Sequence, residues 1–134
     1  SFSVEKFITE LREGKPEEFL IRLRSFFADF PYELNDDTER HYQVVFYLVF
    51  KLMGQFIDAE VHSAFGRADA VVKTADYIYV FEFKLNGSAD EALQQINEKG
   101  YLIPYEVDNR KVVKIGVDFD GKKRNIGKWV VETV

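Results

Sequence analysis

Two charged side chains interrupt an otherwise apolar run, and they are the first candidates for chemistry in this sequence. The run covers Tyr77–Leu85, and its charged residues are Glu82 and Lys84. Residues two apart in a strand point to the same face, so the carboxylate and the ammonium are expected side by side. A strand that is apolar on both faces is typically central and covered from both sides. Because burying an isolated charge is costly, these two groups need an ionic partner or a metal ion.

A further acid stands in the preceding predicted strand. Arg67–Thr74 contains one acidic residue, Asp69, and the short Ala75-Asp76 turn predicts a hairpin with the strand that follows. Such pairing places Asp69 beside Glu82 or Lys84. Two neighbouring carboxylates repel each other unless a cation lies between them, and Mg²⁺ and Mn²⁺ are the ions that prefer oxygen ligands. The alternative is structural: a Glu82–Lys84 pair that ends a strand and reaches solvent.

The elements that must hold these residues are strands and helices behind a helical front. Apolar spacing predicts two amphipathic helices, at Val4–Glu13 and Pro16–Asp29. A third helix, Asp37–Met53, is apolar on nearly every side and is therefore expected to be buried. The remaining predicted elements are strands at Phe56–Ala64, Arg67–Thr74, Tyr77–Leu85, Lys111–Phe119 and Asn125–Glu132, and a helix at Ser88–Gly100. We expect a helical lobe over residues 1–35, packed on an α/β domain over residues 36–134 as a single structural unit.

Composition excludes several kinds of site and location. The 134 residues contain no cysteine, which excludes disulfides, thiolate nucleophiles and cysteine-based zinc sites. Two histidines, His41 and His62, are too few for an all-histidine zinc site, and we expect core or surface roles for both. No apolar stretch approaches the ~18 residues of a membrane span, and no secretion signal opens the sequence. We therefore expect a cytoplasmic protein without membrane contact. The first residue, Ser1, fits a processed chain or a piece of a longer one.

The charge distribution is uneven along the chain. The formal net charge of −5 argues against tight binding to nucleic acid, but seven basic and two acidic residues lie between Arg110 and Lys128. A local basic surface can neutralise phosphates even when the total charge is negative. The alternative is a solvated hairpin whose charges keep an edge strand from pairing.

Asp69 followed thirteen residues later by Glu82-x-Lys84 resembles the motif of the PD-(D/E)XK nuclease superfamily. The resemblance is closer still to a bacterial subfamily that forms the C-terminal domain of proteins with an AAA-ATPase-like front half. Five stretches within about residues 36–119 carry it: Tyr42–Gly54, Gly66–Val72, Ile78–Leu85, Glu91–Tyr105 and Lys111–Gly116. It implies a restriction-endonuclease-like α/β core of one helix, three strands, a helix and two strands. A mixed sheet and two preceding N-terminal helices complete this fold class.

The resemblance also implies a function and roles for individual residues. The function is metal-dependent hydrolysis of nucleic acid, expected to be DNA, with Mg²⁺ or Mn²⁺ as cofactor. Asp69 and Glu82 would ligate the ion together with the Phe83 carbonyl. Lys84 would position or deprotonate the attacking water. Members of the family often add a glutamate from the first core helix, for which this sequence offers Glu39 or, on the first strand, Glu60.

The second core helix offers a further site residue at its edge. At ~100° per residue, Gln95 flanks the apolar stripe of this helix, whereas Gln94 points away from it. Gln95 is therefore the candidate. Some members of the superfamily place a tyrosine four residues after such a glutamine, where this chain has Lys99, and Ala68 stands where the motif has proline.

The sequence also offers candidates for contacts to phosphate groups and for binding partners. Phosphate contacts are expected from Arg67, Lys99, Arg110 and Lys111. The partners that the resemblance implies are DNA and an AAA-ATPase-like domain of the same full-length protein, and a homodimer stays open. The alternative function is a non-catalytic module that keeps the nuclease fold and binds nucleic acid or a partner ATPase domain.

Overall fold

The computed structural model of this chain describes residues 3–29, 38–62 and 69–134, without the side chains of residues 38–41 and 43. Its helices are α1 (Val4–Arg12), α2 (Pro16–Ala28), α3 (Thr38–Met53), α4 (Ala89–Glu98) and the short 3₁₀ turn η1 (Ile103–Tyr105). Its strands are β1 (Asp58–Val61), β2 (Ala70–Lys73), β3 (Tyr77–Leu85), β4 (Lys111–Asp120) and β5 (Asn125–Thr133).

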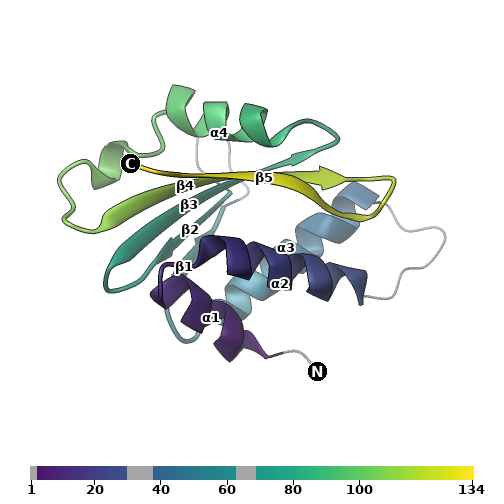
Figure 1. The fold of residues 1–134 in the computed structure, drawn as a ribbon, viewed down its shortest axis with the longest axis horizontal. Helices are drawn as coiled ribbons and strands as arrows, with labels where there is room; N and C mark the ends of the chain where they lie inside the picture. Colours follow the sequence, from purple (N-terminus) through teal and green to yellow (C-terminus); the bar gives the residue numbers. More distant parts are fainter. Residues whose placement is uncertain (1–2, 30–37, 63–68) are drawn as a thin grey trace.

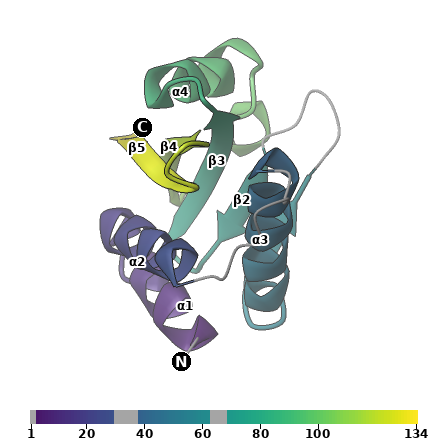
Figure 2. The ribbon, with the colours of Figure 1, turned by 90° about the vertical axis from the view of Figure 1, so that its right-hand side faces the viewer.

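Strand β3 lies at the centre of a five-stranded mixed sheet. The strand order is β1-β2-β3-β4-β5. The β3–β4 pair is parallel and the other pairs are antiparallel. A parallel pair requires a crossover connection, and α4 supplies it. Helix α4 covers one face of the sheet while α1, α2 and α3 cover the other (Figures 1 and 2). This arrangement confirms the expected restriction-endonuclease-like fold class.

The N-terminal helices share one core with the sheet. The Phe19 ring of α2 lies 5.4 Å from that of Phe7, 6.1 Å from that of Phe50 and 5.7 Å from that of Phe81, measured between ring centroids. These partners belong to α1, α3 and β3 respectively. The buried hydroxyl of Tyr79 also donates a hydrogen bond to the main-chain oxygen of Leu11, at 2.6 Å. One ring therefore joins three helices to the central strand.

The central hairpin forms where the sequence predicts it, and β3 has its predicted bounds. Its turn is closed by Thr74 N–H, which donates to the Tyr77 oxygen at 2.8 Å. Strand β1 is shorter than the predicted Phe56–Ala64, because the chain is still turning out of α3 where Ile57 N–H donates to the Met53 oxygen. The predicted start of the second strand, at Arg67, lies outside the described residues.

The prediction that α3 is buried on every side is wrong. Its inward stripe is buried, as at Val45 and Phe50. In contrast, Val44, Tyr47 and Leu48 are each about half exposed. Helix α3 lies in an outer layer of the molecule, so the described residues cover one side of it (Figure 2). No helix within the described ranges is both long enough and apolar enough to cross a membrane.

Helix α4 is held unusually close to the sheet by a glycine in β4. A Cβ atom at Gly116 would lie 2.4 Å from the main-chain oxygen of Ala89 and 2.7 Å from the main-chain nitrogen of Leu93. Any side chain at this position would push the helix away. The helix begins at Ser88, whose hydroxyl accepts a hydrogen bond from Glu91 N–H at 3.0 Å. Close packing and a fixed start set which α4 side chains reach the end of β3.

Because Phe19 bridges the helical lobe and the sheet, we expect Phe19→Ala to destabilise the whole chain by about 3–5 kcal/mol. Denaturant unfolding followed by both circular dichroism and tryptophan fluorescence, reporting on Trp129 of β5, should show one common transition shifted to lower denaturant. Ile21→Ala is the matched control, because this neighbour in α2 is 49% exposed and should change stability by less than about 0.5 kcal/mol. Two separate transitions, with one of them unaffected, would contradict a single structural unit.

Candidate active site

The structure brings Asp69 and Glu82 together at the open end of the β2–β3 hairpin. The last described pair of this ladder is Ala70 opposite Phe81, so the next position places Asp69 opposite Glu82. Asp69 N–H donates to Glu82 Oε1 at 3.2 Å, and Phe83 N–H donates to Asp69 Oδ2 at 2.8 Å. Each carboxylate therefore accepts a hydrogen bond from the main chain of the other segment, which fixes both groups.

The electrostatics of this pair favour a shared proton or a cation. Glu82 is 4% exposed. Burial, followed by the negative charge of Asp69 and a hydrogen bond between the two carboxyl groups, raises the pKa of Glu82 to about 8. Burial also raises the pKa of Asp69, although the Phe83 N–H, Glu82 and Lys84 oppose that shift. Both carboxylates are therefore costly to ionise together without added positive charge.

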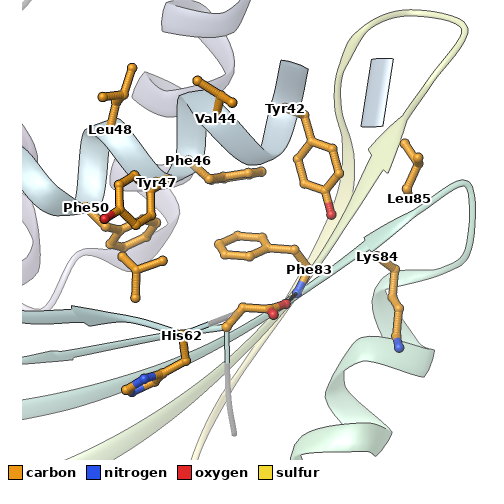
Figure 3. Close-up of a pocket in the computed structure, with 12 residues that line it drawn as sticks. Tyr42, Val44, Phe46, Tyr47, Leu48, Phe50, His62, Phe83, Lys84 and Leu85 are labelled. Atoms are coloured by element: carbon orange, nitrogen blue, oxygen red, sulfur yellow. Dashed lines mark hydrogen bonds between the residues drawn. The ribbon is translucent and has the colours of Figure 1, made fainter. Parts of the chain in front are cut away.

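Lys84 lies beside the pair and is held by α4. Its Nζ donates a hydrogen bond to Gln95 Oε1, and Gln95 Nε2 donates to the Tyr101 hydroxyl at 3.3 Å. In Figure 3 the Lys84 side chain extends from the strand towards α4. Within the described ranges, Lys84 makes no ion pair with a carboxylate. Its ammonium is thus oriented by a neutral amide instead of a carboxylate.

The sequence does not predict a role for Tyr101, which completes this chain of hydrogen bonds. Its side chain is buried, and burial together with the charges of Glu82 and Asp69 raises the pKa of its hydroxyl. The sequence signal was weak, because Gly100 ends the helical spacing between Gln95 and Tyr101. A tyrosine six residues after the glutamine reaches it by a turn, for which helical periodicity gives no indication.

Two further acidic residues, Glu60 and Glu39, are candidates for a third carboxylate at this site. Glu60 lies opposite Val71, on the sheet face of Asp69 and Glu82 but further along β1, and its carboxylate pairs with His62 at 3.3 Å. His62 itself lies next to Asp69, whose main-chain oxygen accepts a hydrogen bond from His62 N–H at 2.9 Å. Its place one strand across from an acid could have been inferred from the pairing register. Glu39 is in α3, and its side chain lies outside the described part.

Two of the basic candidates, Arg110 and Lys111, lie away from the carboxylate pair. Arg110 is engaged by Asp108 at 2.8 Å and by the Thr74 oxygen at 3.1 Å. Lys111 pairs with Tyr77 at the start of β3, roughly 23 Å from Lys84 along the strand at ~3.3 Å per residue. Lys99 is exposed at the end of α4, and Arg67 lies outside the described residues.

The oxygen atoms of Asp69 and Glu82 suit a hard divalent cation that takes its other ligands from water. No cluster of three His, Asp or Glu side chains occurs among the described residues. The pair itself supplies carboxylate oxygens in a buried setting that disfavours two negative charges. Mg²⁺ is typically bound through one or two carboxylates and keeps several waters. The residues therefore fit such an ion, held by Asp69 and Glu82.

Comparison with known proteins places the chain among nucleases of one superfamily. Residues 37–129 match the family described as the PD-(D/E)XK nuclease superfamily. A protein of Azotobacter chroococcum mcd 1, named "Uncharacterized protein in vnfD 5'region", is 32% identical over 117 residues. The match covers 82% of this chain and 23% of that relative. The chain thus spans about a quarter of the length of the curated protein it matches.

The raised pKa of Glu82 has a consequence for stability in metal-free buffer. The folded chain holds the proton up to about pH 8, whereas the unfolded chain releases it near the ordinary glutamate pKa of 4.5. Unfolding between these values releases a proton, so stability should fall as pH rises, by at most about 1.4 kcal/mol per pH unit. Denaturant unfolding in EDTA at several pH values measures this slope. Glu82→Gln is the control and should flatten it; equal slopes for the two proteins would show that Glu82 is ionised throughout.

Proposed function

This chain belongs to the PD-(D/E)XK nuclease superfamily, and from that premise we propose that it is a metal-dependent nuclease that hydrolyses phosphodiester bonds of DNA. One observation carries the proposal: Asp69 and Glu82 meet in a buried pair, with the ammonium of Lys84, which Gln95 orients, beside them. Two acids and a lysine at one strand end are the groups that phosphodiester hydrolysis needs.

Asp69 and Glu82 hold Mg²⁺ or Mn²⁺ in this proposal, with the Phe83 carbonyl as a further oxygen ligand. Glu39 and Glu60 are the remaining candidates for a third carboxylate. Glu60 would have to leave His62 to reach the ion, and this makes Glu39 the better candidate. When bound, the ion lowers the pKa of water and neutralises charge that develops on the phosphate.

The protein's own groups orient the water and the phosphate. Lys84 lies where it can position the attacking water and donate a hydrogen bond to a non-bridging phosphate oxygen. Gln95 holds the Lys84 ammonium, and Tyr101 fixes the orientation of the Gln95 amide. The water oxygen forms a bond to phosphorus as the bond to the leaving sugar oxygen breaks. The water proton leaves to solvent, and the leaving oxygen takes up a proton.

Contacts to the rest of the nucleic acid are proposed for Lys99 and Arg67, which follow or precede residues of the site. Arg110 and Lys111 would contact a duplex only at a distance from the cleaved bond, because they lie at the opposite end of β3. We propose in addition that an AAA-ATPase-like domain accompanies this chain in its full-length protein. The length of the relative, of which 23% is matched, supports that proposal.

The alternative is a non-catalytic module with the nuclease fold that binds nucleic acid or a partner ATPase domain. The net charge of −5 and the exposed apolar residues of α3 favour it. The two functions differ in whether the carboxylate pair binds a metal ion.

Cleavage of plasmid and single-stranded DNA in Mg²⁺ or Mn²⁺ tests the proposal directly. We expect product with either ion, none in EDTA, and a loss of about 100-fold or more in Lys84→Ala, because an oriented charge at the phosphate is removed. Lys6→Ala, an exposed lysine of α1, should cleave like the wild type. A correctly folded wild-type chain that cleaves neither DNA with either ion would rule out the nuclease.

Calorimetry with Mn²⁺ separates the nuclease from the non-catalytic module. Binding should be lost or weakened at least tenfold in Asp69→Asn, which keeps the size of the side chain and removes its charge. Asp76→Asn, at the turn of the same hairpin and exposed, is the matched control and should bind like the wild type. Binding that is absent from the wild type, or equal in all three proteins, favours the module.

A further inference from the structure

A cavity of about 650 Å³ lies next to the carboxylate pair. It opens between α3 and the sheet end that carries Asp69 and Lys84, both of which line it. Figure 3 shows Phe46 and Tyr42 directed from α3 towards Phe83 on the sheet, with His62 below them at the end of β1. Small-molecule sites typically enclose ~300–1,000 Å³. The cavity is thus large enough for one flat group adjoining the candidate catalytic residues.

The lining of this cavity is aromatic and carries little charge. Of the twelve described residues that line it, five are Phe or Tyr, and one, Lys84, is a lysine or arginine. Phe46 and Phe83 are stacked on each other at 3.9 Å between ring centroids and form a rigid wall. Tyr47 is 48% exposed and so presents ring surface to a ligand. Such surfaces bind flat, uncharged ring systems by stacking.

We infer that this cavity receives an unpaired nucleobase, and that the substrate is therefore single-stranded or frayed nucleic acid. The inference rests on the proposed nuclease function and deepens it. In a nucleotide strand each base lies one sugar away from a phosphate, and the cavity likewise adjoins Lys84 and Asp69. A base inside a duplex is stacked and paired, so it would first have to leave the helix. Stacking on aromatic side chains is tolerant of base identity.

The charge distribution supports an unpaired strand over a duplex. Affinity for duplex DNA comes chiefly from lysine and arginine contacts to phosphates. This chain has a net charge of −5, and Arg110 and Lys111 lie at the opposite end of β3 from the cavity. The aromatic residues that line the cavity can contribute to binding by stacking, at ~1–3 kcal/mol per base.

A nucleotide also fits the polar groups of the cavity better than an apolar protein segment does. An apolar helix or a second copy seated here would cover Asp69 and Lys84 and would remove both from water without supplying an opposite charge to either, which is costly. A nucleotide places its base against the rings and its phosphate at the edge of the cavity that Lys84 and Asp69 line. The polar and the apolar parts of the cavity then both have a partner.

Binding of a single-stranded oligonucleotide that contains 2-aminopurine, measured in EDTA so that no cleavage occurs, tests the inference. Stacking should quench the 2-aminopurine fluorescence, and Tyr47→Ala should weaken binding by about 5- to 100-fold. Tyr47→Phe keeps the ring and should retain wild-type affinity. Ile103→Ala is the control, because Ile103 is 64% exposed and does not line the cavity.

Three results would overturn the inference: equal affinity for duplex and single strand, equal affinity of wild type and Tyr47→Ala, or a dimer in solution that Tyr47→Ala dissociates without any change in oligonucleotide binding. Hydrolysis of bis(p-nitrophenyl) phosphate, a diester without a base, separates the two proposals. If it is hydrolysed with Mn²⁺ while single strands show no advantage over duplex, the cavity inference fails and the nuclease stands. If no diester is hydrolysed but single strands bind through Tyr47, the nuclease fails and the cavity inference stands.

Discussion

The structure depends most on two carboxylates that are fixed against each other in a buried position. Asp69 and Glu82 cannot move apart, because each accepts a main-chain N–H from the opposite segment of one hairpin. Burial and mutual repulsion then disfavour the state in which both are ionised. In the absence of a metal ion, the arrangement costs more stability as the pH rises from about 4.5 to about 8. A divalent cation in place of the proton would remove this cost.

The position of Gln95 next to Lys84 depends on the close packing of α4 on the sheet. Gly116 lets the helix approach β4, and the approach brings Gln95 within reach of Lys84. An acid in place of Gln95 would hold the lysine more strongly, but it would also neutralise the ammonium. The amide orients the charge without cancelling it. Tyr101 accepts from the nitrogen end of the same amide, so that its oxygen end faces the lysine.

The sequence predicts those features of the structure that depend on residues close together in the chain. The bounds of β3, its hairpin with β2 and the inward side of α4 follow from alternation, turn length and helical spacing within a few residues. The meeting of Asp69 with Glu82 follows from these. The partnership of Gln95 with Tyr101 could not be predicted, because the helix ends between them. The exposure of Val44, Tyr47 and Leu48 on α3 could not be predicted either. A run of apolar residues shows what a helix is able to bury, but tertiary packing decides which of these residues are covered.

The net charge gives little information about partners when it is taken over the whole chain. The acidic groups that matter are the two whose ionisation the fold opposes, while the basic surplus lies on β4, β5 and the turn between them. Arg110, the first residue of that basic region, is tied to Asp108 and to the Thr74 oxygen and so serves the end of the sheet away from the site. The described residues that line the cavity beside the carboxylate pair include five aromatic rings and Lys84. These rings recognise a ligand by its shape and by stacking, and this holds whether or not the pair catalyses a reaction.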